Sequence, residues 1–162
     1  MVNIPRLDLN SYINGDAAQR KQFSDDIGKA FNDTGFVTIT NHGLDKQLID
    51  KLYEDVKALF ALPDDVKEKY EIPGLAGQRG YTGKQKETAK GFTAPDLKEF
   101  WQIGQTVTDG AKIKDEYPDN IMVDELPSFN ETTLEVYRKL EWAGTHLLRA
   151  IAVYLNLPEN YF

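Results

Sequence analysis

Residues 35–43 read Gly-Phe-Val-Thr-Ile-Thr-Asn-His-Gly, and this stretch decides the fold that we expect. Its centre, Phe36–Thr40, is aromatic and β-branched, which predicts a buried strand. Asn41-His42-Gly43 predicts a turn after the strand, because Asn and Gly accept the backbone angles of tight turns. Apolar residues with helical spacing lie on both sides, so the pattern predicts a strand between two amphipathic helices.

The helix before this strand is predicted to begin at Asp16, whose spacing to Gln19 is that of a capping box. Gly35 is placed to end it. The apolar residues of its inner face are Phe23, Ile27, Ala30 and Phe31. The helix after the strand is predicted to be capped by Asp45. Its apolar residues are Leu48, Leu52, Val56, Leu59 and Phe60.

Shorter elements and loops are expected around these helices. Ile4–Leu9 predicts an edge strand, and a short helix is expected from Pro63 to Tyr70. Residues 73–95 are rich in Gly, Lys and Thr and show no period, so they predict a long loop. Residues 97–107 predict a strand, and 109–127 form an acidic irregular segment. The residues on one side of that strand are Trp101, Ile103 and Val107.

The longest predicted element is a helix over residues 128–155. Ser128 and Glu131 have capping-box spacing at its start. Apolar and small residues then recur at helical spacing, as Phe129, Thr133, Val136, Leu140, Ala143, Leu147, Ile151 and Tyr154. This periodicity predicts one unbroken helix with a single apolar face.

Composition fits one ordinary domain, 1–162, in a chain of 162 residues. Hydrophobic residues make up 41% and charged residues 28%, which indicates a globular protein. The net charge of −7 argues against a nucleic-acid partner. The absence of cysteine excludes disulfides and thiolate metal sites. No apolar run of the ~20 residues of a membrane span and no signal-peptide pattern are present, so we expect a cytoplasmic protein without a membrane partner.

Three further motifs follow the opening stretch in a characteristic order. They are Arg79-Gly80-Tyr81-Thr82, then Asp96-Leu97-Lys98-Glu99-Phe100-Trp101, then Leu157-Pro158-Glu159-Asn160-Tyr161-Phe162. In this order the chain resembles the N-terminal region of iron- and 2-oxoglutarate-dependent oxygenases of the isopenicillin N synthase-like family. The resemblance implies an α+β fold, with a helical N-terminal region and the first strands of a double-stranded β-helix (jelly roll) that is incomplete in this chain.

The same resemblance implies Fe(II) and 2-oxoglutarate as cofactors of the complete enzyme. Members of the family hold iron with a His-x-Asp…His triad in their second half, which leaves open positions for the cosubstrate and oxygen. This chain has two histidines. His42 is followed by Gly43-Leu44, and His146 has no second His four residues away. We therefore expect structural roles for both histidines and no metal, cofactor-binding or catalytic residue in this chain.

Two residues are candidates for substrate binding by resemblance. The Arg79-Gly80-Tyr81 segment would lie over the mouth of the active site. Arg79 would pair with a substrate carboxylate, and Tyr81 would supply an aromatic wall. Arg79 also begins a basic cluster against the single acid Glu87 that favours an anion, although solvated lysines in a mobile loop are the alternative. The other members of the cluster are Lys84, Lys86 and Lys90.

Two functions from different classes are consistent with these features. The first is the N-terminal portion of an oxygenase that oxidises or hydroxylates a small molecule, with this chain inactive alone. The alternative is a non-catalytic interaction or assembly module derived from that family. It would use the exposed face of helix 128–155, through Val136, Leu140, Leu147 and Ile151. Both predict an exposed apolar patch, and hence self-association, a partner chain or marginal stability. The sequence names neither the prime substrate nor the natural length of the chain.

Overall fold

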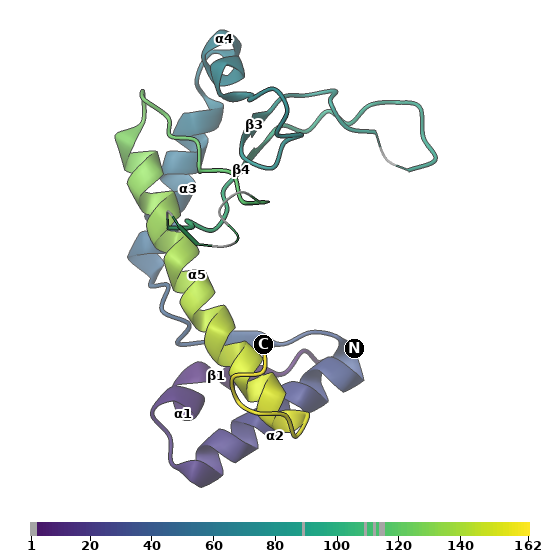
Figure 1. Cartoon of the computed structure of the whole chain (residues 1–162), viewed down its shortest axis with the longest axis vertical. Coiled ribbons are helices and arrows are strands. Elements are labelled where there is room, and N and C mark those ends of the chain that lie inside the picture. Colours follow the sequence, from purple (N-terminus) through teal and green to yellow (C-terminus); the bar gives the residue numbers. More distant parts are fainter. Residues whose placement is uncertain (1–2, 89, 109, 112, 114–115) are drawn as a thin grey trace. The chain divides into compact units, whose positions relative to one another are not determined.

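The computed structural model describes residues 3–88, 90–108, 110–111, 113 and 116–162. Parts of the predicted segments 73–95 and 109–127, namely residues 89, 109, 112 and 114–115, lie outside the described residues. The chain separates into two compact units. Unit 1 comprises Met1–Asp45 with Arg138–Phe162, and unit 2 comprises Lys46–Tyr137 (Figure 1).

Unit 1 contains a two-stranded parallel sheet followed by helices. Strand β1 (Arg6–Asp8) pairs with β2 (Thr38–Thr40), with Leu7 opposite Ile39. Helix α1 (Leu9–Ile13) comes directly after β1, because the Asp8 side chain accepts a hydrogen bond from the Asn10 amide at 2.9 Å and caps it. The predicted edge strand is therefore confirmed in its centre but ends at Asp8, before Leu9.

Helix α2 (Ala17–Thr34) confirms the predicted start and stop signals. Asp16 and Gln19 form the capping box, and Gly35 has a φ of 73°, the left-handed angle that a glycine C-cap adopts. Phe23, Ile27 and Ala30 are buried. Phe31 was predicted on the same face but is 44% exposed, because the core lies on the side of Ala30.

Strand β2 is shorter and less buried than predicted. It begins at Thr38, and Phe36 is 66% exposed. Val37 and Ile39 pack against the core of unit 1, whereas Thr38 is exposed. The alternation follows from the period of two in a strand with one covered face. The prediction of a buried strand over Phe36–Thr40 was wrong for its first residues and for the outer face.

The core of unit 1 joins these elements to the C-terminal part of α5 (Pro127–Tyr154). Its buried members are Leu9, Tyr12, Phe23, Ile27, Ala143 and Ala150. Gly28 lies so close to α5 that a Cβ atom there would be 2.3 Å from the Tyr154 ring. Outside the core, Glu159 accepts hydrogen bonds from Tyr12 at 2.8 Å and from Arg20 at 2.6 Å.

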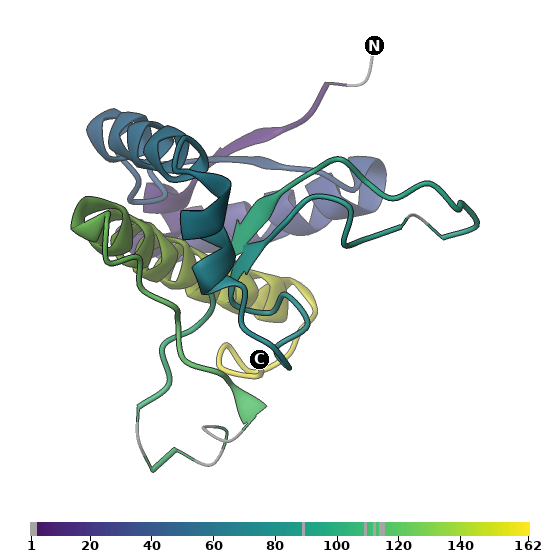
Figure 2. The same cartoon turned by 90° about the horizontal axis from the view of Figure 1, so that it is seen from above.

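Unit 2 contains the helices α3 (Lys46–Phe60) and α4 (Asp64–Lys67), the 3₁₀ helix η1 (Glu68–Tyr70) and an antiparallel strand pair. The strands are β3 (Gly80–Thr82) and β4 (Phe100–Gln102), with Tyr81 opposite Trp101. The predicted short helix to Tyr70 is confirmed as α4 and η1. The segment between β3 and β4 projects away from the strand pair (Figure 2) and has an isolated bridge between Thr88 and Pro95.

Strand β3 lies inside the segment predicted as a loop. All three of its residues are buried, so the apolar-polar alternation that marks a strand in sequence is missing. The strand predicted over 97–107 is reduced to β4. Trp101 packs edge-on against Tyr70 and Phe129, with ring centroids 5.8 and 5.5 Å apart, which confirms it as a core side chain. The buried residues of this core are Leu59, Tyr70, Tyr81, Val123 and Phe129.

Helix α5 confirms the longest predicted element to within one residue at each end. Its predicted capping box at Ser128 was wrong, because the helix begins at Pro127 and the Ser128 hydroxyl donates to Asp55 at 3.0 Å instead. Asn130 fixes the approach to the helix by bonding both the amide and the carbonyl of Val123. No helix in the described part of the chain is long and apolar enough to cross a membrane.

Candidate functional site

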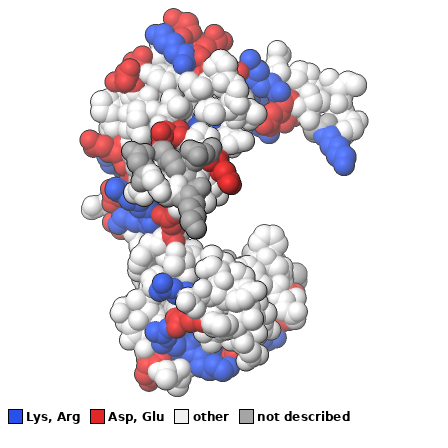
Figure 3. Space-filling view, in the orientation of Figure 1, with Lys and Arg blue, Asp and Glu red and all other residues white. Residues whose placement is uncertain are grey.

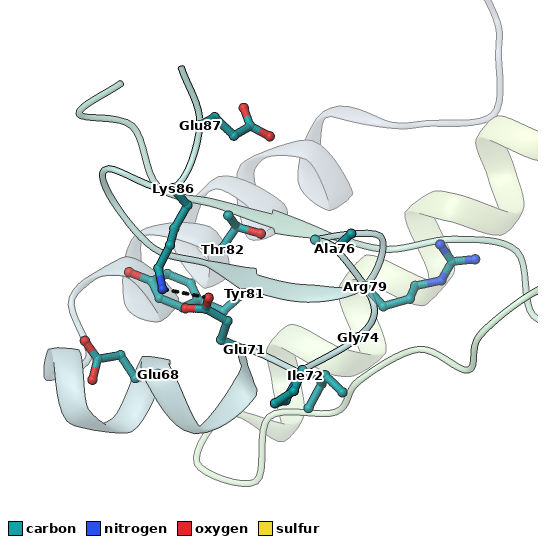
Figure 4. Close-up of a pocket in the computed structure, with 12 residues that line it drawn as sticks. Glu68, Glu71, Ile72, Gly74, Ala76, Arg79, Tyr81, Thr82, Lys86 and Glu87 are labelled. Atoms are coloured by element: carbon teal, nitrogen blue, oxygen red, sulfur yellow. Dashed lines mark ion pairs between the residues drawn. The ribbon is translucent and has the colours of Figure 1, made fainter. Parts of the chain in front are cut away.

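A pocket of about 770 Å³ lies in unit 2 and contains both predicted site residues in its wall. The wall is formed by residues from η1, from the loop over residues 71–79 that includes Arg79, and from strand β3, together with Lys86 and Glu87 (Figure 4). Arg79 and Tyr81 flank Gly80, which has a φ of 77°. A regular strand would place the side chains of residues 79 and 81 on one face, and the left-handed φ of Gly80 interrupts that alternation. Both residues line the pocket, and in Figure 4 their side chains point away from each other.

Tyr81 is a core side chain as well as a wall residue. It is 4% exposed, and its hydroxyl donates a hydrogen bond to Glu99 Oε2 at 2.6 Å. Burial, together with the hydrogen bond to Glu99, raises the pKa of Tyr81 to about 12. The phenol therefore stays protonated near neutral pH, and Tyr81 supplies shape and a fixed donor.

Lys67 forms the centre of a charged network beneath Tyr81. Its side chain is 3% exposed, and Nζ lies 2.8 Å from Glu99 and 3.0 Å from Asp64. The hydrogen bond to Glu99 raises the pKa of Lys67, against the opposing effect of burial. In turn, Lys67 and then Tyr81 lower the pKa of Glu99. Lys67 and Glu99 are thus both charged, which satisfies a buried cation that would otherwise be costly.

The Arg79 side chain is held by contacts within unit 2 and does not extend freely into solvent. Nη1 donates to the Gln78 carbonyl oxygen at 2.7 Å, and the guanidinium lies against Gly104. Nε is buried without a hydrogen-bond partner. No carboxylate among the described residues forms an ion pair with Arg79, so its charge is not neutralised within the described part of the chain.

Two of the four cations of the predicted basic cluster, Lys84 and Lys86, lie near acids, and the prediction of a single opposing acid was wrong. Lys86 pairs with Glu71 at 3.0 Å, and Lys84 lies 3.9 Å from Glu99. Glu87 pairs with Lys98 at 2.7 Å. On the face seen in Figure 3, basic and acidic side chains lie interspersed. Glu71 and Glu99 lie outside the basic run in sequence, and only the fold brings them to it.

The two histidines do not form a metal site in the described chain. His42 Nδ1 accepts a hydrogen bond from the Leu44 amide at 3.3 Å, which ties down the turn after β2 as expected. His146 packs edge-on against Trp142, with ring centroids 4.8 Å apart, and burial lowers its pKa. Among the described residues, no group of three or more His, Cys, Asp or Glu side chains is arranged to hold a metal. The described residues therefore do not fit an iron centre.

The sequence pattern of a family described as "non-haem dioxygenase in morphine synthesis N-terminal" matches residues 4–125. The chain belongs to this family. The 2-oxoglutarate-dependent dioxygenase frbA of a Dothideomycetidae species is 31% identical over 98% of this chain and 49% of its own length. The proline hydroxylase buaE of Petromyces alliaceus is 30% identical over 99% of this chain and 50% of its own length.

Solved structures show the same relationship. A protein assigned to the 2OG-Fe(II) oxygenase family from Caulobacter crescentus aligns with 100% of this chain and 52% of its own, with a TM-score of 0.83 and 33% identity. A full-length Neurospora crassa protein in complex with alpha-KG has a TM-score of 0.78 at 24% identity, over 99% of this chain and 51% of its own, which shows the fold alone. The chain spans about half the length of the curated relatives it matches.

These matches confirm the predicted family and fold class. Helices with few short strands are what the N-terminal half of these oxygenase structures contains, so the small sheets fit an incomplete jelly roll. The name of frbA states a dependence on 2-oxoglutarate, and the family name of the Caulobacter protein adds Fe(II). The structure of JOX2, which is 23% identical, contains 2OG and Fe. No role could be assigned from the sequence to Lys67, Glu99 or Gly104, although Glu99 lies in one of the family motifs. The contacts that define their roles join distant residues: Lys67 to Glu99, Tyr81 to Glu99, and Arg79 to Gly104.

Proposed function

We propose that this chain is the N-terminal half of an Fe(II)- and 2-oxoglutarate-dependent oxygenase that oxidises or hydroxylates a small molecule. The alignment of the whole chain with 52% of the Caulobacter structure carries this proposal. In that arrangement the residues of this chain supply scaffold and part of a substrate pocket. The iron ligands and the 2-oxoglutarate site would come from the other half.

The proposal is tested by assaying succinate release with Fe(II), 2-oxoglutarate and oxygen. We expect none from the 162-residue chain, and turnover from a polypeptide that continues past Phe162 in the gene's own reading frame. That downstream frame should encode His-x-Asp…His. Tight iron binding and decarboxylation of 2-oxoglutarate by the 162-residue chain alone would refute the division of roles.

Arg79 and Tyr81 are proposed to contact the prime substrate. The support is that both line one pocket and that Arg79 has no ion-pair partner among the described residues. A guanidinium that no described carboxylate pairs with suits a substrate carboxylate, which it can bind through two parallel hydrogen bonds. In the complete enzyme, Arg79→Ala should raise the prime-substrate KM at least about tenfold, the loss of one charge-assisted hydrogen bond. An unchanged KM would remove Arg79 from the site.

A second candidate, the interaction module, is favoured by exposed apolar side chains on α5. Leu140 and Leu148 are 52% and 46% exposed and lie on one helix face, with Gly144 open between them. Of the other residues predicted for this surface, Val136 is buried, and Leu147 and Ile151 pack against the core of unit 1. We propose that in a protein of the relatives' length this face packs against the other half, and that it self-associates when left bare. Sedimentation of the 162-residue chain tests this, and a monomer at all concentrations would contradict it.

We also propose that the protein is cytoplasmic, and the location of a fluorescent fusion would check this.

A further inference from the structure

Gly104, two residues after β4, has its backbone fixed by one side chain. The Gly104 amide donates to Asn120 Oδ1 at 2.8 Å, and Asn120 Nδ2 donates to the Gly104 carbonyl at 2.9 Å. Asn120 therefore mimics a strand partner and satisfies both backbone groups of this buried residue. The position of Gly104 is set independently of Arg79.

The open side of Gly104 is filled by the Arg79 guanidinium. A Cβ atom at position 104 would lie 2.0 Å from both Cζ and Nη2 and 2.6 Å from Nε, well under the 3.0 Å that real Cβ atoms keep. The contact also accounts for the burial of Nε. With Nη1 on the Gln78 carbonyl, the guanidinium is held from two directions.

We propose that Gly104 and Asn120 are positioning residues for Arg79. Because Gly104 has no side chain, the guanidinium of Arg79 can pack directly on its backbone, and we call this position the seat of Arg79. The two hydrogen bonds from Asn120 hold the Gly104 backbone in place. The inference rests on the proposed function for its consequence, since a seated Arg79 presents its charge to a substrate carboxylate in one orientation. A displaced guanidinium would pair less well with that carboxylate, so the expected effect is a raised prime-substrate KM.

Gly104 is a sharper test position than Gly80, where an added Cβ atom would also be crowded. Gly80 has a φ of 77°, and a Cβ there would be 2.5 Å from the Tyr70 carbonyl, so a side chain would strain the backbone itself. Gly104 has no left-handed φ, and its three nearest atoms all belong to the end of a flexible side chain. Gly104→Ala should therefore leave the fold intact and move Arg79.

The first experiment follows the Nε–Hε signal of Arg79 by NMR in the 162-residue chain. The signal is assigned by its loss in Arg79→Lys, and we expect slow hydrogen exchange in the wild type. Gly104→Ala should shift it and speed its exchange, and Asn120→Asp, which lacks the donor to the Gly104 carbonyl, should do so more weakly. Gly144→Ala, with no heavy atom within 4 Å of the added Cβ, is the matched control and should leave it unchanged.

The second experiment is a double-mutant cycle, which isolates the coupling between the two positions. Gly104→Ala should lower the melting temperature in the wild type but not in Arg79→Ala, where the added methyl group has room. An unmoved Arg79 signal, or an equal loss of melting temperature in both backgrounds, would overturn the proposal.

A third measurement separates the positioning from the substrate role. In the complete oxygenase, Gly104→Ala should raise the prime-substrate KM as Arg79→Ala does, with kcat and the KM for 2-oxoglutarate unchanged. If the Arg79 signal moves and neither variant changes the prime-substrate KM, the positioning stands and the substrate role of Arg79 fails. If Arg79→Ala raises that KM but Gly104→Ala does not, the positioning proposal is overturned.

Discussion

Units 1 and 2 differ in where their charged side chains lie. In unit 1 the charged groups of α2 pair on its outer face, as Lys21 does with Asp25 at 2.6 Å, and the core beneath is apolar. In unit 2 a lysine, Lys67, lies inside at 3% exposure, against Glu99 at 18%. The ion pairs of unit 1 lie at its surface, while unit 2 has an ion pair with a buried lysine.

The difference indicates what each kind of interior is suited to. A buried ion pair often adds little net stability over apolar residues of similar volume, but losing one partner is costly. In unit 2 the pair also fixes the Tyr81 hydroxyl through Glu99, so it sets the geometry of a pocket wall. A smaller pocket in unit 1, of about 130 Å³, is lined by Glu159, whose ion pair with Arg20 is exposed to solvent.

The largest effect is expected in the apolar core of unit 1. Ile27 is fully buried, so Ile27→Ala should cost about 3–4 kcal/mol of unfolding free energy through lost burial and a cavity. The loss should appear as faster amide hydrogen exchange in α2. Ile4→Ala, at a position 48% exposed, is the matched control and should change exchange little. Equal effects at both positions would mean that unit 1 lacks a tight core.

The next effect is expected from the ion pair of unit 2. Lys67→Met should cost about 3 kcal/mol, because it leaves the Glu99 carboxylate partly buried without its main partner. Adding Glu99→Gln should recover most of the loss. Urea unfolding followed by Trp101 fluorescence, in a Trp142→Phe background, reports on unit 2 alone. No recovery in the double variant would show that packing, and not charge, sets the cost.

A smaller effect is expected from the Tyr81 hydroxyl. The pKa of Tyr81 in the folded chain, about 12, exceeds its reference value of 10.0. Its contribution to stability is therefore complete below pH 10 and is lost as the pH rises toward 12. Tyr81→Phe should cost about 1 kcal/mol at neutral pH and make this alkaline loss in unit 2 shallower. Unit 1, where burial raises the pKa of Tyr12, should keep its own alkaline loss in the variant.

The smallest effect is expected on the surface of unit 1. Lys21→Ala breaks an exposed ion pair between residues four positions apart on one helix. The unfolding free energy should therefore change by less than about 0.5 kcal/mol. Raising the salt concentration should make the difference in unfolding free energy between Lys21→Ala and the wild type smaller still. A loss comparable with that of Lys67→Met would erase the contrast between the two units.

The order of the main elements was predictable because local signals specify it. Asp16, Gln19 and Gly35 mark the ends of α2, and the apolar period marks α5. Helix α1 escaped prediction because it has five residues and begins inside an expected strand. Strand β3 escaped because a strand buried on both faces shows no alternation.

Only the residues that lie in a family motif could be predicted for the candidate site. The resemblance pointed to Arg79 and Tyr81, but not to what holds them. Lys67 and Glu99 are 32 residues apart, and a salt bridge across that separation leaves no periodic trace in sequence. Glu99 belongs to the motif Asp96–Trp101, but its role became clear only from the ion pair with Lys67 in the folded chain. The seat of Arg79 on Gly104 is likewise a product of tertiary packing.

The contact between Gly28 and the Tyr154 ring has an evolutionary consequence. Since a methyl group at position 28 would overlap that ring, the two sites cannot drift separately. Homologous chains with alanine or serine at position 28 should have lost the aromatic group from the end of α5, and those that keep the ring should keep glycine.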